Sequence, residues 1–101
     1  MGIERDCTIL NVKGLTLGLW EAAYLAKKGE TKKSSDIIER IKEEVNGLKQ
    51  EYTAASIFKK EYDVDLSVLY NSIKEIKKGN FDNAISQLKD INKKINSLYR
   101  I

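Results

Sequence analysis

The chain offers few side chains that could do acid–base, nucleophilic or metal chemistry. It contains no histidine and one cysteine, Cys7, among its 101 residues. Imidazole triads, histidine or thiolate zinc sites and dithiol redox pairs are therefore excluded, because each needs a histidine or a second thiolate. Carboxylates, lysines, tyrosines and serines remain. From this inventory we expect a protein that is not an enzyme, with no cofactor and no bound metal.

The densest carboxylate cluster lies near the middle of the chain, at Glu61, Asp63 and Asp65. Carboxylates bind hard cations, but the EF-hand pattern needs an Asp-x-Asp-x-Asp-Gly order with a later glutamate, and the order here differs. We interpret this cluster, and likewise Glu43-Glu44, as a solvated helix face rather than a metal site.

Five lysine doublets could contact phosphate groups. A nucleic-acid binder would gather such charges on one face, whereas acidic residues flank most of these doublets and the net charge is only +3. No helix-turn-helix, glycine-rich phosphate loop or aromatic stacking motif accompanies them. A nucleic-acid-associated accessory protein is therefore the second hypothesis, and nucleic acid is not the partner we expect. The doublets are Lys27-Lys28, Lys32-Lys33, Lys59-Lys60, Lys77-Lys78 and Lys93-Lys94.

The segment 15–26, LTLGLWEAAYLA, is unusual because, as a helix, it would carry apolar residues on nearly every side. A helix in a four-membered bundle should present one polar face, so something must cover the second apolar face. Our functional hypothesis is an exposed groove or dimer surface centred on Leu17, Trp20 and Tyr24, since exposed aromatic patches mark interaction sites. A membrane-surface helix is disfavoured because the segment lacks a charged opposite face. In the remaining alternative, N-terminal residues fold over that face: Ile3, Ile9, Leu10 and Val12.

Helical periodicity predicts four helices. Apolar residues recur at spacings of three and four in four stretches, and the absence of proline leaves little to interrupt them. The first and third stretches end at Lys27-Lys28-Gly29 and Lys77-Lys78-Gly79, where cations and a following glycine are helix-stop signals. The sequence therefore predicts an all-α fold, an antiparallel four-helix bundle made of two similar helical hairpins at about 15–55 and 57–99. Residues 1–13 are left unassigned.

Capping residues and apolar stripes place the helix starts. The second helix is expected behind the N-cap cluster Ser34-Ser35-Asp36, and the fourth behind the N-cap Asn80, with Asp82 in its first turn. The third carries an unbroken apolar stripe from Phe58 to Ile76, which predicts one continuous helix.

The two hairpins repeat at an offset of 50 residues. Leu19-Trp20 falls on Leu69-Tyr70, the two Lys-Lys-Gly stops coincide, and so do the apolar positions of the second and fourth helices. Such repetition is typical of a supersecondary unit used twice. In the alternative explanation, any two amphipathic hairpins align in this way once their glycines are superposed.

Two stretches resemble known helical families. Residues 15–21, LTLGLWE, together with Leu69-Tyr70 are similar to the flagellin export chaperones, whose bundles wrap a partner helix, although this chain is shorter. Residues 62–73, YDVDLSVLYNSI, resemble the small cytoplasmic immunity proteins of bacteriocin producers, which are also antiparallel helical bundles. Both resemblances imply a protein that works by binding another protein. Likeness at the level of the fold is analogy.

Composition and length are typical of a single globular domain. Hydrophobic residues at 42% and charged residues at 33% are a globular balance, and the length suits one domain, 1–101. The longest nearly uncharged stretch, 14–26, is too short to span a membrane, and the N-terminus lacks the apolar core of a signal peptide. We therefore expect a cytoplasmic protein-binding module of adaptor, chaperone or bacteriocin-immunity type. Its partner would be another protein or a second copy in a homodimer.

Overall fold

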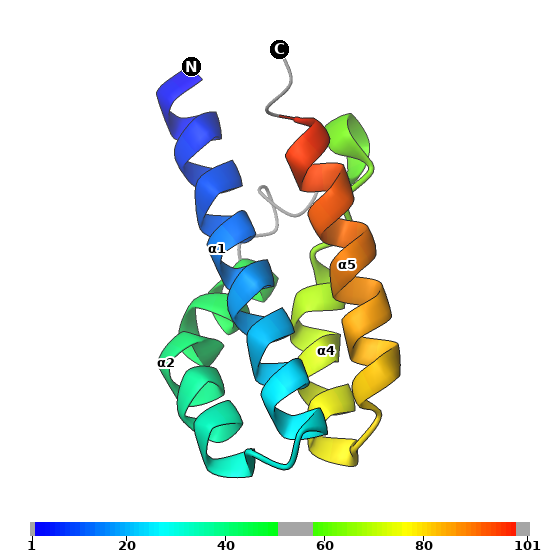
Figure 1. The fold of residues 1–101 in the computed structure, drawn as a ribbon. Coiled ribbons are helices and arrows are strands. Elements are labelled where there is room, and N and C mark those ends of the chain that lie inside the picture. Colours follow the sequence, from blue (N-terminus) through cyan, green and yellow to red (C-terminus); the bar gives the residue numbers. More distant parts are fainter. Residues whose placement is uncertain (1, 51–57, 99–101) are drawn as a thin grey trace.

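The chain is helical throughout most of the part that the computed structural model describes, residues 2–50 and 58–98 (Figure 1). Side chains are described for residues 9–48 and 58–98. Within these ranges no strand is present, which confirms the predicted all-α class. A further helical segment covers residues 58–62. The helices labelled in Figure 1 are α1 (Gly2–Lys27), α2 (Thr31–Gln50), α4 (Ser67–Lys78) and α5 (Phe81–Ser97).

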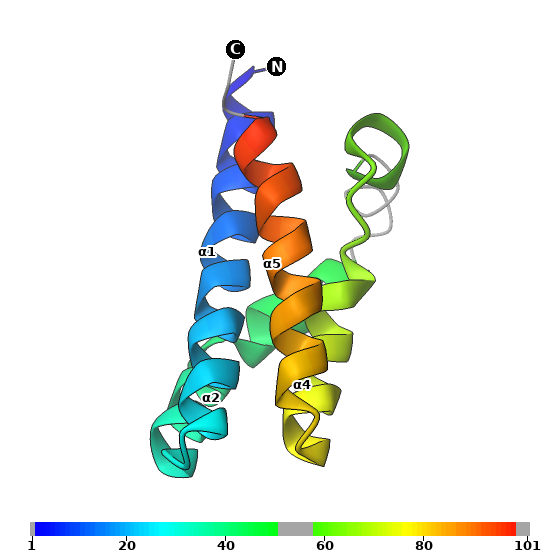
Figure 2. The same cartoon turned by 45° about the vertical axis from the view of Figure 1, so that its right-hand side comes forward.

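Helix α1 contacts each of the other three labelled helices. It packs along α2 and α5 and also touches α4, while α4 packs against α5 and α2. Figure 2 shows α1 and α5 side by side. Because α1 has three neighbours, it buries side chains over a wide arc, and this explains most of the apolar character of segment 15–26. From that segment Leu15, Leu19, Ala22 and Ala23 enter the core.

Helix α1 begins at Gly2, so it includes residues 2–13, most of the segment that the sequence left unassigned. The alternative in which this segment folds back over the first helix is therefore wrong, because a continuous helix cannot cover its own side. Ile9 and Val12 are buried in the core instead, whereas Leu10 is exposed. The covering role is thus excluded for Ile3, Ile9, Leu10 and Val12.

Both Lys-Lys-Gly helix stops are confirmed. Gly29 and Gly79 have φ of +89° and +86°, the left-handed region that glycine enters without steric cost. Each glycine N–H donates to the carbonyl three residues earlier, at 3.0 and 3.1 Å, and the next N–H donates to the carbonyl five residues earlier, at 2.9 Å in both turns. This is the hydrogen-bond pattern of a Schellman motif. The chain therefore reverses twice by the same local geometry, once into α2 and once into α5.

The start of α2 differs from the prediction. The helix begins at Thr31, ahead of the cluster Ser34-Ser35-Asp36, so these residues are not its N-cap. Ser34 is buried, and its Oγ donates to the carbonyl oxygen of Ala22 at 2.7 Å, which ties α2 to α1. The sequence cannot distinguish a serine that caps its own helix from one that bonds to a neighbouring helix, and the N-cap prediction failed for that reason.

Helix α5 begins where the sequence predicts, with Asn80 in the N-cap position and Asp82 in the first turn. The Asn80 side chain makes no bond to its own helix. Its Nδ2 donates to Oε2 of Glu75 at 2.8 Å, and this hydrogen bond lowers the pKa of Glu75 because it stabilises the ionised carboxylate.

The predicted continuous helix from Phe58 to Ile76 is wrong, because residues 63–66 are not helical. Asp63 has φ of +55°, a left-handed conformation that aspartate tolerates better than most residues. The N–H of Val64 then donates to the carbonyl of Phe58 at 3.0 Å. The apolar stripe continues across the break, since Phe58, Val64 and Leu66 are all buried.

Asp65 holds the start of α4. Its Oδ1 accepts hydrogen bonds from the backbone N–H of Ser67 at 3.0 Å and from Ser67 Oγ at 2.6 Å. The Ser67 hydroxyl, more than the backbone bond, lowers the pKa of Asp65. An aspartate just ahead of a helix satisfies an N–H that has no partner within the first turn.

Candidate protein-binding surface

The large hydrophobic side chains that remain exposed in the described residues are Leu10, Leu17 and Tyr24, with 57, 43 and 49% of their surface accessible. All three lie on α1 at intervals of seven residues. Seven residues make almost two helical turns, so the three side chains share one side of the helix. From Leu10 to Tyr24 they extend about 21 Å along its axis. We call these three residues the α1 stripe.

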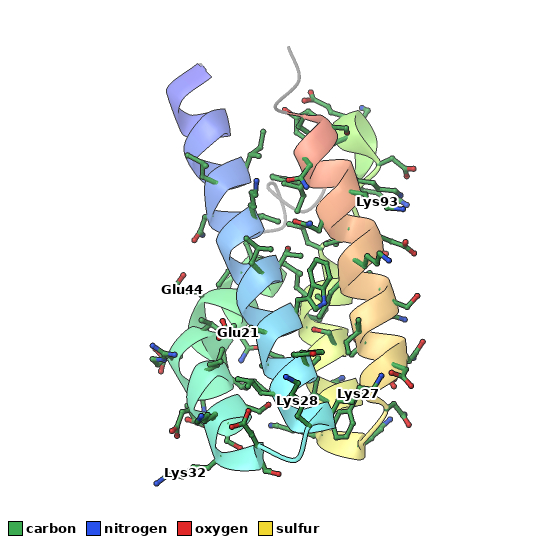
Figure 3. The ribbon with its side chains drawn as sticks, viewed as in Figure 1. Glu21, Lys27, Lys28, Lys32, Glu44 and Lys93 are labelled. Carbon is green, nitrogen blue, oxygen red and sulfur yellow. The ribbon has the colours of Figure 1, made fainter. Side chains whose placement is uncertain are left out.

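A row of small and charged residues lies beside the α1 stripe. Gly14, Glu21 and Lys28 each follow a stripe residue by four positions, and all three are exposed. Figure 3 labels Glu21 and Lys28 toward the end of α1 that leads into α2. The Nζ of Lys28 lies 4.5 Å from the centre of the Tyr24 ring, a cation–π contact. The stripe is therefore apolar along its middle and charged along this edge.

Trp20 occupies the opposite edge of the stripe. It is half-buried and packs against the core, whereas Leu17 and Tyr24, which precede and follow it along the chain, are exposed. The structure thus places the predicted site residues Leu17 and Tyr24 on one exposed line and Trp20 at its border. Leu10 belongs to the same line, and sequence reasoning missed it because residues 1–13 had no assigned structure.

The equivalent positions in the second half of the chain are polar. At the 50-residue offset, Leu17 corresponds to Ser67 and Tyr24 to Lys74. The apolar character of the stripe therefore has no counterpart in the second half of the chain. Buried pairs at this offset, in contrast, keep apolar residues in both halves: Leu19 and Leu69, Ile38 and Leu88, and Val45 and Ile95.

Two lysine side chains bond to Asp63, the middle residue of the carboxylate cluster at 61–65. Lys94 Nζ lies 3.3 Å from Oδ2 of Asp63, and Lys59 Nζ lies 3.3 Å from its Oδ1. Hydrogen bonds from Lys94 first and Lys59 second lower the pKa of Asp63. All three carboxylates are exposed, but Asp63 and Asp65 lie in the break and not on a helix face as expected. Among residues whose side chains are described, no group of three or more potential metal ligands comes together.

Three of the five lysine doublets lie at one end of the molecule. Lys27-Lys28 and Lys77-Lys78 close α1 and α4, and Lys32-Lys33 begins α2, so all three meet at the two turns (Figure 1). Acidic residues neutralise part of this charge. Lys27 Nζ lies 2.6 Å from Oδ1 of Asp82, a hydrogen bond that raises the pKa of Lys27, and Lys33 pairs with Glu30 at 3.0 Å.

The other two doublets lie away from the turns, as Lys93 on α5 illustrates in Figure 3. A pocket of about 340 Å³ opens at the turn end, and both basic and acidic side chains line it, including Lys77, Lys78 and Glu39. The doublets therefore form no single basic face.

Comparison with models of known protein families, with curated proteins and with solved structures gives no match. The resemblances to flagellin export chaperones and to bacteriocin-immunity proteins gain no support from these comparisons. No helix in the described ranges combines the length and the apolar character needed to cross a bilayer. The class that the structure defines is an all-α protein, and its most distinctive surface is the α1 stripe.

Proposed function

We propose that this chain is a small cytoplasmic protein-binding helical module, of the adaptor, chaperone or immunity type, and that it binds its partner through the α1 stripe and the adjoining Trp20. The observation that carries this proposal is the row of exposed Leu10, Leu17 and Tyr24 on one helix. Transfer of apolar surface out of water stabilises a complex by roughly 25 cal/mol per Å² before the costs of association. A partner that covers this row gains that stabilisation.

The proposal includes the finer architecture, an antiparallel four-helix bundle of two similar hairpins. The equivalent turns at Gly29 and Gly79 support it, because each reverses the chain between two packed helices. In such a bundle the outer side of α1 remains available to a partner helix, which packs ridges into grooves on a convex helix surface.

The experiment compares capture by three immobilised proteins: the wild type, Leu17→Glu and Ser86→Glu. Ser86 is exposed on α5, so Ser86→Glu adds the same charge away from the stripe. We expect a protein from the lysate of the source cells to be retained by the wild type and by Ser86→Glu, and lost from Leu17→Glu. Equal retention by all three would contradict the proposal. Far-ultraviolet circular dichroism checks that each variant keeps its helix content.

Trp20→Ala tests the edge of the same surface. Weaker capture with unchanged helicity would assign Trp20 to binding. An unfolded variant would assign it to the core, against which its side chain packs.

A nucleic-acid-associated accessory role is the second candidate, because three lysine doublets gather at the turn end. Phosphate contacts release counterions, so binding through these lysines must weaken steeply as salt rises. Fluorescence anisotropy with labelled DNA and RNA, on the wild type and on the double variant Lys77→Gln, Lys78→Gln, measures this slope. Undetectable or salt-independent binding would eliminate the candidate.

A further inference from the structure

We infer that the occupant of the α1 stripe is a second copy of this chain, which docks its own α1 in the opposite direction about a two-fold axis at Leu17. This inference rests on the proposed function, because it names the partner of the same surface. The stripe is symmetric about its middle, since Leu10 and Tyr24 each lie seven residues from Leu17. An antiparallel second copy therefore places Leu17 on Leu17 and Leu10 on Tyr24. One register covers every stripe residue of both copies.

The charge along α1 selects this direction over a parallel one. Beside the stripe α1 carries Glu21, and Lys28 follows the last residue of the helix, Lys27; all three are exposed. Two parallel copies would bring their lysines together, and like charges in contact oppose association. Two antiparallel copies centred on Leu17 keep Lys28 far from Lys28 and Glu21 away from Glu21, and their helix dipoles also run in opposite directions.

Gly14 supplies an independent observation. It lies exposed inside α1, where glycine disfavours a helix relative to alanine. A Cβ on Gly18 would lie 3.3 Å from Cδ1 of Ile41, so packing within the chain explains that glycine. A Cβ on Gly14 would meet no described atom within 4 Å, so packing against the described residues does not explain Gly14. In the antiparallel register Gly14 of one copy lies beside Glu21 of the other, where a missing side chain lets the two helices approach closely.

Disulfide trapping tests the register. In a Cys7→Ser background, Leu17→Cys should cross-link to itself under mild oxidation. Leu10→Cys mixed with Tyr24→Cys should form the mixed dimer, and neither should cross-link efficiently to its own kind. Ser86→Cys on α5 is the control, and we expect no dimer from it. Self-linked Leu10→Cys without the mixed product would indicate parallel helices and would overturn the inference.

Sedimentation equilibrium over a wide concentration range tests association itself. A surface of one helix is smaller than a standard interface, so we expect a dissociation constant in the micromolar to millimolar range. Leu17→Glu should raise that constant at least about tenfold, or about 1.4 kcal/mol. Gly14→Ala should raise it too, although alanine favours the helix. Gly47→Ala on α2, where a Cβ also meets nothing described within 4 Å, should leave it unchanged.

The outcomes separate this inference from the proposed function. A wild-type chain that stays monomeric at every concentration, while Leu17→Glu abolishes capture of a different protein, overturns the homodimer and leaves the proposed function standing. A monomer whose capture is indifferent to Leu17→Glu overturns both. A dimer that Leu17→Glu and Gly14→Ala do not weaken also overturns the inference, because its interface lies elsewhere.

Discussion

Leu17 and Leu19 lie two residues apart on α1 and have opposite surroundings: Leu19 is fully buried, while Leu17 exposes 43% of its surface. The same helix therefore supplies both the core and the candidate binding surface. Substitution at one position should affect folding, and substitution at the other should affect association.

Leu19→Ala should lower the free energy of unfolding by about 2–5 kcal/mol, since it removes buried methyl groups and leaves a cavity. Leu17→Ala should lower it by less than about 1 kcal/mol, because surface substitutions rarely exceed that range. Urea unfolding of both variants at low protein concentration measures the difference. Equal losses would show that Leu17 is part of the core.

Gly29→Ala and Gly79→Ala should each destabilise the protein by about 1–2 kcal/mol, because a Cβ is disfavoured at positive φ. Gly47→Ala is the matched control inside α2, and it should stabilise by up to about 1 kcal/mol through helix propensity. Thermal unfolding followed by circular dichroism distinguishes the two signs. Neutral substitutions at both turns would contradict the shared Schellman geometry.

Ser34→Ala should lower the free energy of unfolding by about 1 kcal/mol, the usual net contribution of a hydrogen bond. The bond lost is the one from Ser34 Oγ to the carbonyl oxygen of Ala22. Ser35→Ala, at an exposed neighbour, is the control for urea unfolding.

Asp65→Ala should destabilise the protein by about 1 kcal/mol near neutral pH, because the variant loses the bonds to Ser67 at the start of α4. Those bonds lower the pKa of Asp65 in the folded state below its unfolded value. Their contribution is therefore present above the unfolded pKa and is lost as the pH falls through the folded pKa. Urea unfolding at about pH 7 and about pH 2 should show the wild type and Asp65→Ala converging in acid. Asp90→Ala, an exposed aspartate on α5, is the control, and a difference that persists in acid would contradict this role.

Features that depend on local chemistry were predictable from the sequence. The glycines at 29 and 79 end their helices because the required φ is a property of the residue itself. The break at 63–66 was not predictable by periodicity, because Phe58, Val64 and Leu66 stay apolar and buried on both sides of it. The helical spacing of apolar residues indicates which positions are buried. It does not detect a short break in the helix when the apolar residues on both sides of the break remain buried.

The candidate surface was predictable only in part. Leu17 and Tyr24 could be placed by their excess of apolar character, but the burial of Trp20 depends on how α1 packs against its neighbours. Leu10 joined the surface only once α1 was seen to continue back to Gly2. The polar residues at the equivalent positions, Ser67 and Lys74, became informative only when both turns proved to have the same geometry.

The left-handed conformation of the two turn glycines restricts which amino acids can replace them. At Gly29 and Gly79 the backbone angles are near the mirror image of those that L-amino acids prefer, so encoded replacements other than asparagine and aspartate meet strain. A D-alanine introduced by chemical synthesis would meet none from its backbone angles. It would restrict the unfolded chain more than glycine does, and each such residue should therefore make the folded protein more stable.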